Sequence, residues 1–201
     1  MIRNFVLYLF WSVLNHKPLK QSRKTLYAIV QTKQKNNMKK AFLIFTLLLI
    51  SISFAQEKRK AFTLEIAANE TQQYKAEIPE SPFFVKEKIL QIYCGEKIFI
   101  ECEISKDTIS TMKIVEKNIN PKKTIEIEFI QDSEDRKNIR TILIVKNPFD
   151  KKLNYNAIMF TPLSQNWKST SIIPIQPNLM NYEMWPHAII SIVLEEWRFE
   201  N

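Results

Sequence analysis

The sequence predicts an all-β domain, an antiparallel immunoglobulin-like β-sandwich of about eight strands, preceded by a cleaved signal helix. Three observations lead to this fold class. Apolar and polar residues alternate with a period of two, Asn-Pro turns separate the alternating runs, and no helical crossover pattern interrupts them. A closed barrel would give a similar pattern and is the alternative architecture.

The first element is a secretory signal peptide at residues 38–55. Two lysines follow Met38, residues 41–50 are uncharged and apolar, and small residues occupy positions 53 and 55. A helix over residues 41–55 would measure roughly 23 Å, which is shorter than the ~30 Å core of a bilayer. We therefore expect cleavage after Ala55, a periplasmic or secreted product, and no stable membrane insertion after cleavage.

Residues 1–37 precede a signal peptide that is complete and has its own methionine at position 38. We interpret them as the result of a start codon assigned too far upstream. A disordered extension, or an unusually long basic region of the signal peptide, is the alternative. On either interpretation residues 56–201 form a single β-sandwich domain.

The charge of the chain is concentrated in the front quarter. Nine of the 29 Lys and Arg residues, and none of the 21 Asp and Glu residues, precede Gln56. The predicted domain therefore carries 20 basic and 21 acidic residues, interleaved along its strands. This distribution lacks the basic patch that nucleic-acid binding requires, so we expect no nucleic-acid partner.

Nine segments of the domain have the alternation or the apolar content of strands. The clearest is 98–104, in which apolar residues share one face while Glu101 and Glu103 occupy the other. Residues 142–145 are apolar on both faces, which predicts a central strand. The nine predicted strands are 62–67, 88–94, 98–104, 110–116, 124–130, 139–146, 153–160, 169–175 and 188–199.

Turn-forming residues separate these segments. Asn-Pro pairs at 120–121 and 147–148 predict turns in which proline presets the backbone angle φ. Residues 132–136 form a polar loop, and prolines recur through the last third of the chain. No helix is favoured anywhere in the domain except a single helical turn near residues 178–185.

Two cysteines, Cys94 and Cys102, would enter an oxidising compartment. A disulfide between them needs Cα atoms about 5.5 Å apart, so the chain would have to fold back around Ile98. Ile98 begins the clearest alternating run, which opposes a turn there. Two buried thiols are the favoured interpretation, and a disulfide is the alternative.

The residues do not assemble a recognisable catalytic or metal-binding motif. His187 is the single histidine of the domain, Gly95 is the single glycine of the chain, and no nucleophile elbow or calcium loop is present. We therefore expect no metal and no cofactor. Three carboxylate pairs remain, which we interpret as solvated strand faces rather than acid–base pairs: Glu101/Glu103, Glu126/Glu128 and Glu195/Glu196.

Aromatic residues concentrate in the last part of the chain, at Trp167, Tyr182, Trp185 and Trp197. Exposed, they would form a binding patch, because large rigid side chains supply contact area at low entropic cost. Buried, they would close the open end of the sandwich with their N–H groups bonded to loops. Glu183 lies among them and, if buried, must accept hydrogen bonds from a neighbouring loop.

These observations favour a non-enzymatic binding or structural module. It would contact another exported or cell-envelope protein, or a surface polymer, through a sheet edge or through the aromatic end. A hydrolase that uses carboxylates is one alternative. A periplasmic chaperone-like or assembly factor is another, and it would present a long, uncovered edge strand without Lys or Pro.

Overall fold

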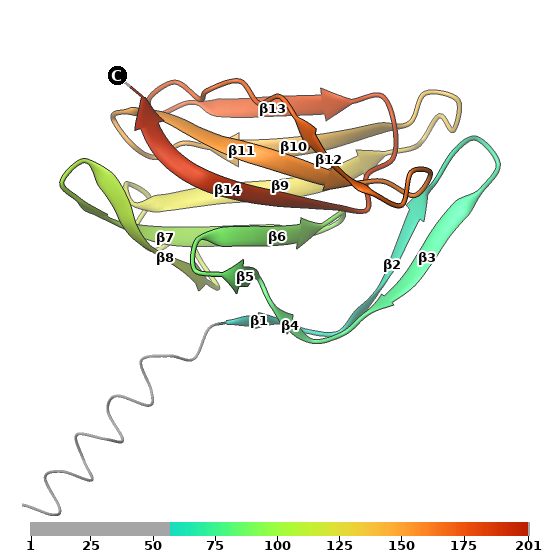
Figure 1. Cartoon of the computed structure of the whole chain (residues 1–201), viewed down its shortest axis with the longest axis horizontal. Helices are drawn as coiled ribbons and strands as arrows, with labels where there is room; N and C mark the ends of the chain where they lie inside the picture. The colour runs from blue at the N-terminus through green and yellow to red at the C-terminus, as the bar shows by residue number, and fades with distance from the viewer. Residues whose placement is uncertain (1–56, 201) are drawn as a thin grey trace, which may run out of the picture. The chain divides into compact units, whose positions relative to one another are not determined.

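Two antiparallel sheets pack face to face in the computed structural model, which describes residues 57–200 (Figure 1). Each sheet has five strands, and we name each one after its central strand. The β14 sheet has the order β12-β11-β14-β6-β5, and the β9 sheet has the order β13-β10-β9-β7-β8. Residues Gln56–Asn201 form one compact unit. The predicted signal peptide and residues 1–37 lie outside the described residues.

The strands of the β14 sheet come from the middle and the end of the chain. They are β5 Phe84–Lys86, β6 Ile89–Tyr93, β11 Lys152–Phe160, β12 Trp167–Thr170 and β14 Ser191–Glu200. The β9 sheet contains β7 Lys97–Ser105, β8 Thr108–Val115, β9 Thr124–Asp132, β10 Arg140–Lys146 and β13 Met180–Trp185. Both sheets are open, so each ends in two strands that have a neighbour on one side only.

The core lies between the two sheets and follows the period-two pattern. Ile100, Ile125 and Leu143 of the β9 sheet are fully buried, as are Ile192 and Leu194 of the β14 sheet. All belong to one continuous apolar cluster. Burying a side chain of this size stabilises a fold by about 1.5–3 kcal/mol, so these alternating faces hold the sheets together.

A buried arginine attaches the start of the domain to the β14 sheet. Arg59 lies in β1 (Lys58–Arg59), which pairs with β4 (Ser81–Pro82). Its Nε donates to Glu96 Oε1 at 2.8 Å, and its guanidinium lies 4.6 Å and 4.9 Å from the ring centroids of Phe83 and Tyr93. Ion pairing and aromatic packing thus compensate for burial of the charge.

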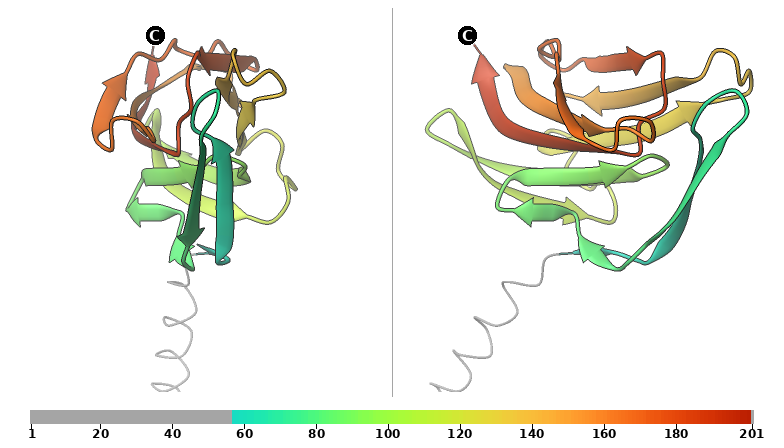
Figure 2. Two further views of the ribbon diagram at one scale, coloured as in Figure 1. Left: turned by 90° about the vertical axis from the view of Figure 1, so that its right-hand side faces the viewer. Right: turned by 45° about the vertical axis from the view of Figure 1, so that its right-hand side comes forward.

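A separate hairpin connects β1 to β4 and lies against one end of the sandwich (Figure 2). It consists of β2 (Phe62–Ala67) and β3 (Gln73–Ile78). The Gln131 amide donates to the carbonyl of Ala67 at 2.9 Å and accepts its N–H at 2.8 Å. Arg136 donates to the carbonyl of Gln72 at 2.7 Å. These side-chain contacts fix the hairpin to the end of β9.

Asn147 organises the turn that follows β10. This residue is fully buried, and its Nδ2 donates to the carbonyls of Lys151 at 2.8 Å and Ile175 at 3.1 Å. Its backbone N–H donates to the carbonyl of Leu179 at 2.9 Å. The predicted Asn-Pro turn is therefore present, and it also sets the position at which β13 begins.

The structure confirms the predicted all-β, antiparallel sandwich, and the open edges of both sheets exclude the closed barrel. All nine predicted segments contain a strand. The predicted number of about eight is too low, because the described residues form 14 strands. The missed strands are the polar β3, the short β1, β4 and β5, and β13.

Two predictions for the last third of the chain are wrong. Residues 178–185 contain no helical turn, because Met180–Trp185 pairs along β10 as a strand. Residues 169–175 are not one strand, because β12 ends at Thr170 and only Ile175 bonds back to β11, at Leu153. In both places prolines and asparagines mark local irregularity, but tertiary pairing decides which residues join a sheet.

Candidate functional site

Strand β13 is a six-residue edge strand of the β9 sheet, drawn at the upper margin of Figure 1. It pairs antiparallel with β10, so that Met184 faces Ile142, Tyr182 faces Ile144 and Met180 faces Lys146. No other strand of the described region pairs with its second side. The strand contains neither Lys nor Pro, the residues that commonly protect a sheet edge.

The direction of the backbone groups in β13 follows from its register. Residue pairs of an antiparallel ladder alternate between hydrogen-bonded and non-hydrogen-bonded. The N–H of Asn147 donates to the carbonyl of Leu179, so Asn181, Glu183 and Trp185 also bond across to β10. Met180, Tyr182 and Met184 therefore point their N–H and C=O groups away from the sheet. Within residues 57–200 these outward groups have no hydrogen-bond partner.

The same three residues expose their side chains on the outer face of the sheet. The exposed fractions of Met180, Tyr182 and Met184 are 46%, 57% and 60%. Ile142 and Ile144 lie beside them on β10 and are half-buried. We call these five residues the β13 patch. It combines free backbone groups with contiguous apolar side chains, which is the surface that strand addition requires.

The inner face of β13 is fixed to the opposite sheet. Trp185 is buried and donates its Nε1–H to Thr170 Oγ1 at 2.9 Å. Glu183 Oε1 accepts the backbone N–H of Ile173 at 2.9 Å and the Asn181 Nδ2–H at 2.8 Å. Glu183 is half-buried, and it accepts the N–H of a neighbouring loop as was expected for a buried carboxylate at this position. These contacts hold β13 in an extended conformation while its outer side stays open.

The four aromatic residues singled out in the sequence do not form one site. Trp185 and Trp197 are buried, with exposed fractions of 8% and 7%. Trp197 donates its N–H to the carbonyl of Lys88 at 3.1 Å, as expected for a residue that closes the core. Trp167 and Tyr182 are exposed, but Trp167 packs against Phe160 in the β14 sheet. Only Tyr182 belongs to the β13 patch.

Met180 and Met184 lie among the aromatic residues of the last third, but sequence reasoning did not assign them to the binding patch. Their alternation with Asn181 and Glu183 was a usable signal. The prolines and asparagine that flank the strand instead favoured a turn. In addition, the apolar side chains of an alternating strand usually face the core, and here they face solvent.

The two cysteines are free thiols in the structure, Cys94 after β6 and Cys102 within β7, and no disulfide joins them. Burial raises the pKa of Cys94 to about 12 and the pKa of Cys102 to about 12. Each is therefore protonated at neutral pH, which makes it a poor nucleophile. Both side chains contribute to the apolar core.

The carboxylate pairs are spread along strand faces, and Glu126 and Glu128 are each paired with a lysine. Lys146 contacts Glu126 at 2.9 Å, and Lys97 contacts Glu128 at 3.0 Å. The hydrogen bond from Lys146 lowers the pKa of Glu126. A general acid in glycoside cleavage needs a raised pKa, so Glu126 has the opposite tendency. Because Lys146 lies directly opposite Met180, these charged residues border the β13 patch on the outer face.

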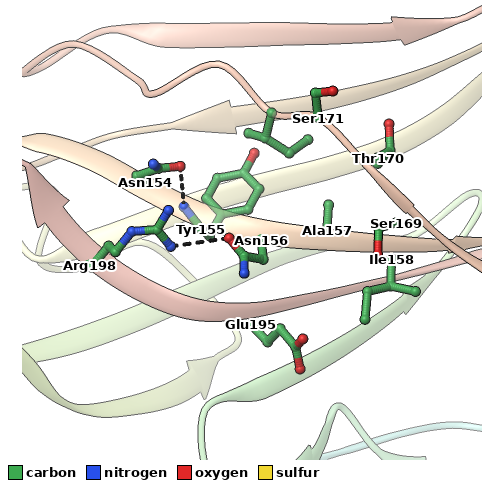
Figure 3. A pocket seen from close by; sticks show the side chains of 11 residues that line it. Asn154, Tyr155, Asn156, Ala157, Ile158, Ser169, Thr170, Ser171, Glu195 and Arg198 are labelled. Carbon is green, nitrogen blue, oxygen red and sulfur yellow. Dashed lines mark hydrogen bonds between the residues drawn. The ribbon is translucent and has the colours of Figure 1, made fainter.

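A polar slot opens in the β14 sheet where β12 separates from β11 (Figure 3). Its volume is about 260 Å³, and Asn156, Glu195 and Arg198 line it. The buried Tyr155 hydroxyl lies at this slot and has no hydrogen-bond partner within the described residues. Burial, with a contribution from the charge of Glu183, raises the pKa of Tyr155. The slot shares no residue with the β13 patch.

Three further findings concern metal sites, membrane-spanning helices and similarity to known proteins. Residues 57–200 contain no cluster of three or more His, Cys, Asp or Glu side chains that would hold a metal ion. The part of the chain that the structure describes also includes no helix both long and apolar enough to cross a bilayer. No protein-family model, no curated protein and no solved structure matches the sequence or the fold.

Proposed function

We propose that this chain is an exported, non-catalytic binding module that takes up an extended segment of another protein chain as an additional strand beside β13. A single observation carries this proposal. Met180, Tyr182 and Met184 present free backbone N–H and C=O groups and exposed apolar side chains on the same edge. Backbone hydrogen bonds would supply affinity, and the alternating side chains would select the partner.

The rigidity of the edge supports this function. The hydrogen bonds of Trp185 and Glu183 hold the inner side of β13 in place. A strand that is already extended loses little conformational entropy when a partner binds, so more of the contact energy becomes affinity. The favoured ligand is an extended segment with small or apolar residues at alternate positions, because these would lie beside Met180, Tyr182 and Met184.

The compartment is part of the proposal and rests on the sequence. Residues 38–55 would direct export and would be removed, leaving a periplasmic or secreted domain. Arg59 is already buried in the domain, so cleavage after Ala55 would leave the fold intact. We also retain an immunoglobulin-like arrangement as the proposed type of sandwich. The partner would be another exported or cell-envelope protein, which includes a second copy of the chain.

Panning a displayed library of short linear peptides against the protein as purified from cells tests the binding function. Selected peptides should shift the amide resonances of Met180, Tyr182 and Met184. Tyr182→Lys should weaken their binding about 10- to 100-fold, because a lysine on the edge opposes strand pairing. Thr111→Lys, which places the same charge on the opposite edge strand, is the matched control. Peptides that bind equally well to both variants would contradict the proposal.

Sequencing of the mature N-terminus tests the proposed export. The expected first residues are Gln56-Glu57-Lys58. Retention of residues 38–55 on the exported protein would contradict cleavage.

A further inference from the structure

We infer that the strand paired with β13 is β13 of a second copy, so that two chains join their β9 sheets into one continuous antiparallel sheet. This inference rests on the proposed function and names its partner. The interface would be two-fold symmetric, with the symmetry axis passing between the two Tyr182 residues. A two-fold contact uses the same surface on both copies, so the surface must be complementary to itself.

The backbone of β13 meets this requirement. Met180, Tyr182 and Met184 all direct their N–H and C=O groups outward. Antiparallel pairing centred on Tyr182 places it opposite its own copy and places Met180 opposite Met184. Every one of these pairs is then of the hydrogen-bonded type, so each outward donor and acceptor gains a partner.

The side chains of β13 are also symmetric about Tyr182. The exposed row reads Met, Tyr, Met in either direction, so both copies would place matching apolar groups side by side on one face. Cross-strand pairs of aromatic and apolar residues stabilise such a sheet. The half-buried Ile142 and Ile144 extend this apolar strip on each copy.

The charges of the strand favour this register. Glu183 is the only charged residue of β13. Pairing centred on Tyr182 places Glu183 opposite Asn181 of the other copy, a neutral amide, and not opposite the second carboxylate. Like charges directly opposite each other would destabilise the pair. Residues 56–201 carry 20 basic and 21 acidic residues, so two copies approach without strong net repulsion.

Single cysteines in the full chain test the register directly. Paired positions in an antiparallel sheet lie within the Cα separation that a disulfide allows. Under mild oxidation Tyr182→Cys should form an interchain disulfide. Met180→Cys alone and Met184→Cys alone should not, but a mixture of these two variants should cross-link. Cys94 and Cys102 give little background because both are buried.

Light scattering after size exclusion completes the test. The unmodified chain should have twice the monomer mass and should dissociate on dilution, and Tyr182→Lys should be monomeric. Thr111→Cys, on β8, measures cross-linking by random collision. A monomer at every concentration, or Tyr182→Cys cross-linking no faster than Thr111→Cys, would overturn the inference. If the chain is monomeric but selected peptides still bind at β13, the second copy is excluded while the binding function stands.

Discussion

Strands β13 and β8 are the two edges of the same sheet, but their outer surfaces are opposite in character. On β8 the side chains of the outer face include Thr111 and Lys113, which lie opposite Glu103 and Glu101 of β7, and a bulge distorts the pairing. On β13 the outward residues are Met180, Tyr182 and Met184, with no bulge. Charge and irregularity protect an edge against pairing, so β8 is protected and β13 is not.

The two edge strands resemble each other on the inner face of the sheet. Trp185 of β13 and Ile109 of β8 are both buried in the common core. Folding therefore requires apolar side chains on the inner face of both strands, but it leaves the side chains on the outer face free to vary. An apolar, regular outward side on one edge alone points to a contact outside the domain.

The largest expected effect concerns the buried inner face, to which both edge strands contribute a side chain. Trp185→Ala should lower the free energy of unfolding by about 3–5 kcal/mol, because it leaves a cavity and removes the bond to Thr170. Ile109→Ala on β8 should lower it by about 2–5 kcal/mol. Chemical denaturation measures both values. A loss below about 1 kcal/mol for Trp185→Ala would show that β13 is not anchored as described.

A proline tests the free backbone of β13. Tyr182→Pro removes an outward N–H and leaves the bonds to β10 intact, since edge strands tolerate proline on the free side. Compared with Tyr182→Ala, it should weaken association at this edge about tenfold further, as measured by light scattering.

Glu183→Pro is the internal control for that substitution. The N–H of Glu183 bonds to β10, so its loss should destabilise the monomer itself more than Tyr182→Pro does. Equal unfolding free energies for the two proline variants would contradict the assigned hydrogen-bond direction.

Removing the protection of β8 should have a smaller effect. Lys113→Met makes the outward side of β8 more like that of β13, but the bulge at Glu103 and Ile104 remains. We expect a weak new association, worth about 1 kcal/mol or less, visible as a rise in apparent mass at high concentration. Strong dimerisation of this variant would mean that a single lysine, and not edge geometry, distinguishes the two strands.

The smallest expected effect involves the charged residues of the outer face. Because Lys146 lowers the pKa of Glu126, this carboxylate stabilises the fold above the ordinary Glu pKa, and the contribution disappears as the pH falls through the lowered value. Glu126→Gln should therefore reduce stability slightly at pH 7 and by less at acidic pH, in denaturation experiments at both values. A larger deficit at the acidic pH would contradict this sign.

The sequence was sufficient for most of the fold and for little of the site. Ile98 to Cys102 and Ile125 to Phe129 alternate clearly because one face of each strand is buried, and the structure places both runs in the core. Ile104 was expected on the same buried face, but it lies beyond a bulge in β7 and is 45% exposed. Burial of Trp197 with its N–H bonded to a carbonyl was likewise foreseen as one of two interpretations. Local pattern and core burial agree at these positions.

Strand β13 was missed because its pattern is inverted. Met180, Tyr182 and Met184 alternate with Asn181 and Glu183, but the apolar members face solvent and the polar members face the loop at Ile173. A one-residue change of register would exchange these faces, so alternation alone does not say which face is inward. Only the bonds between β13, β10 and the Ile173 loop decide it.

Amide hydrogen exchange resolved by residue tests the central claim most directly. If another chain pairs with β13, the amide protons of Met180, Tyr182 and Met184 should exchange more slowly as the chain concentration rises or as a selected peptide is added. The exchange rates of the β8 amides that point away from β7 should not change. Exchange at β13 that stays fast in every complex, with slowing confined to another surface, would contradict the assignment of this edge as the binding site.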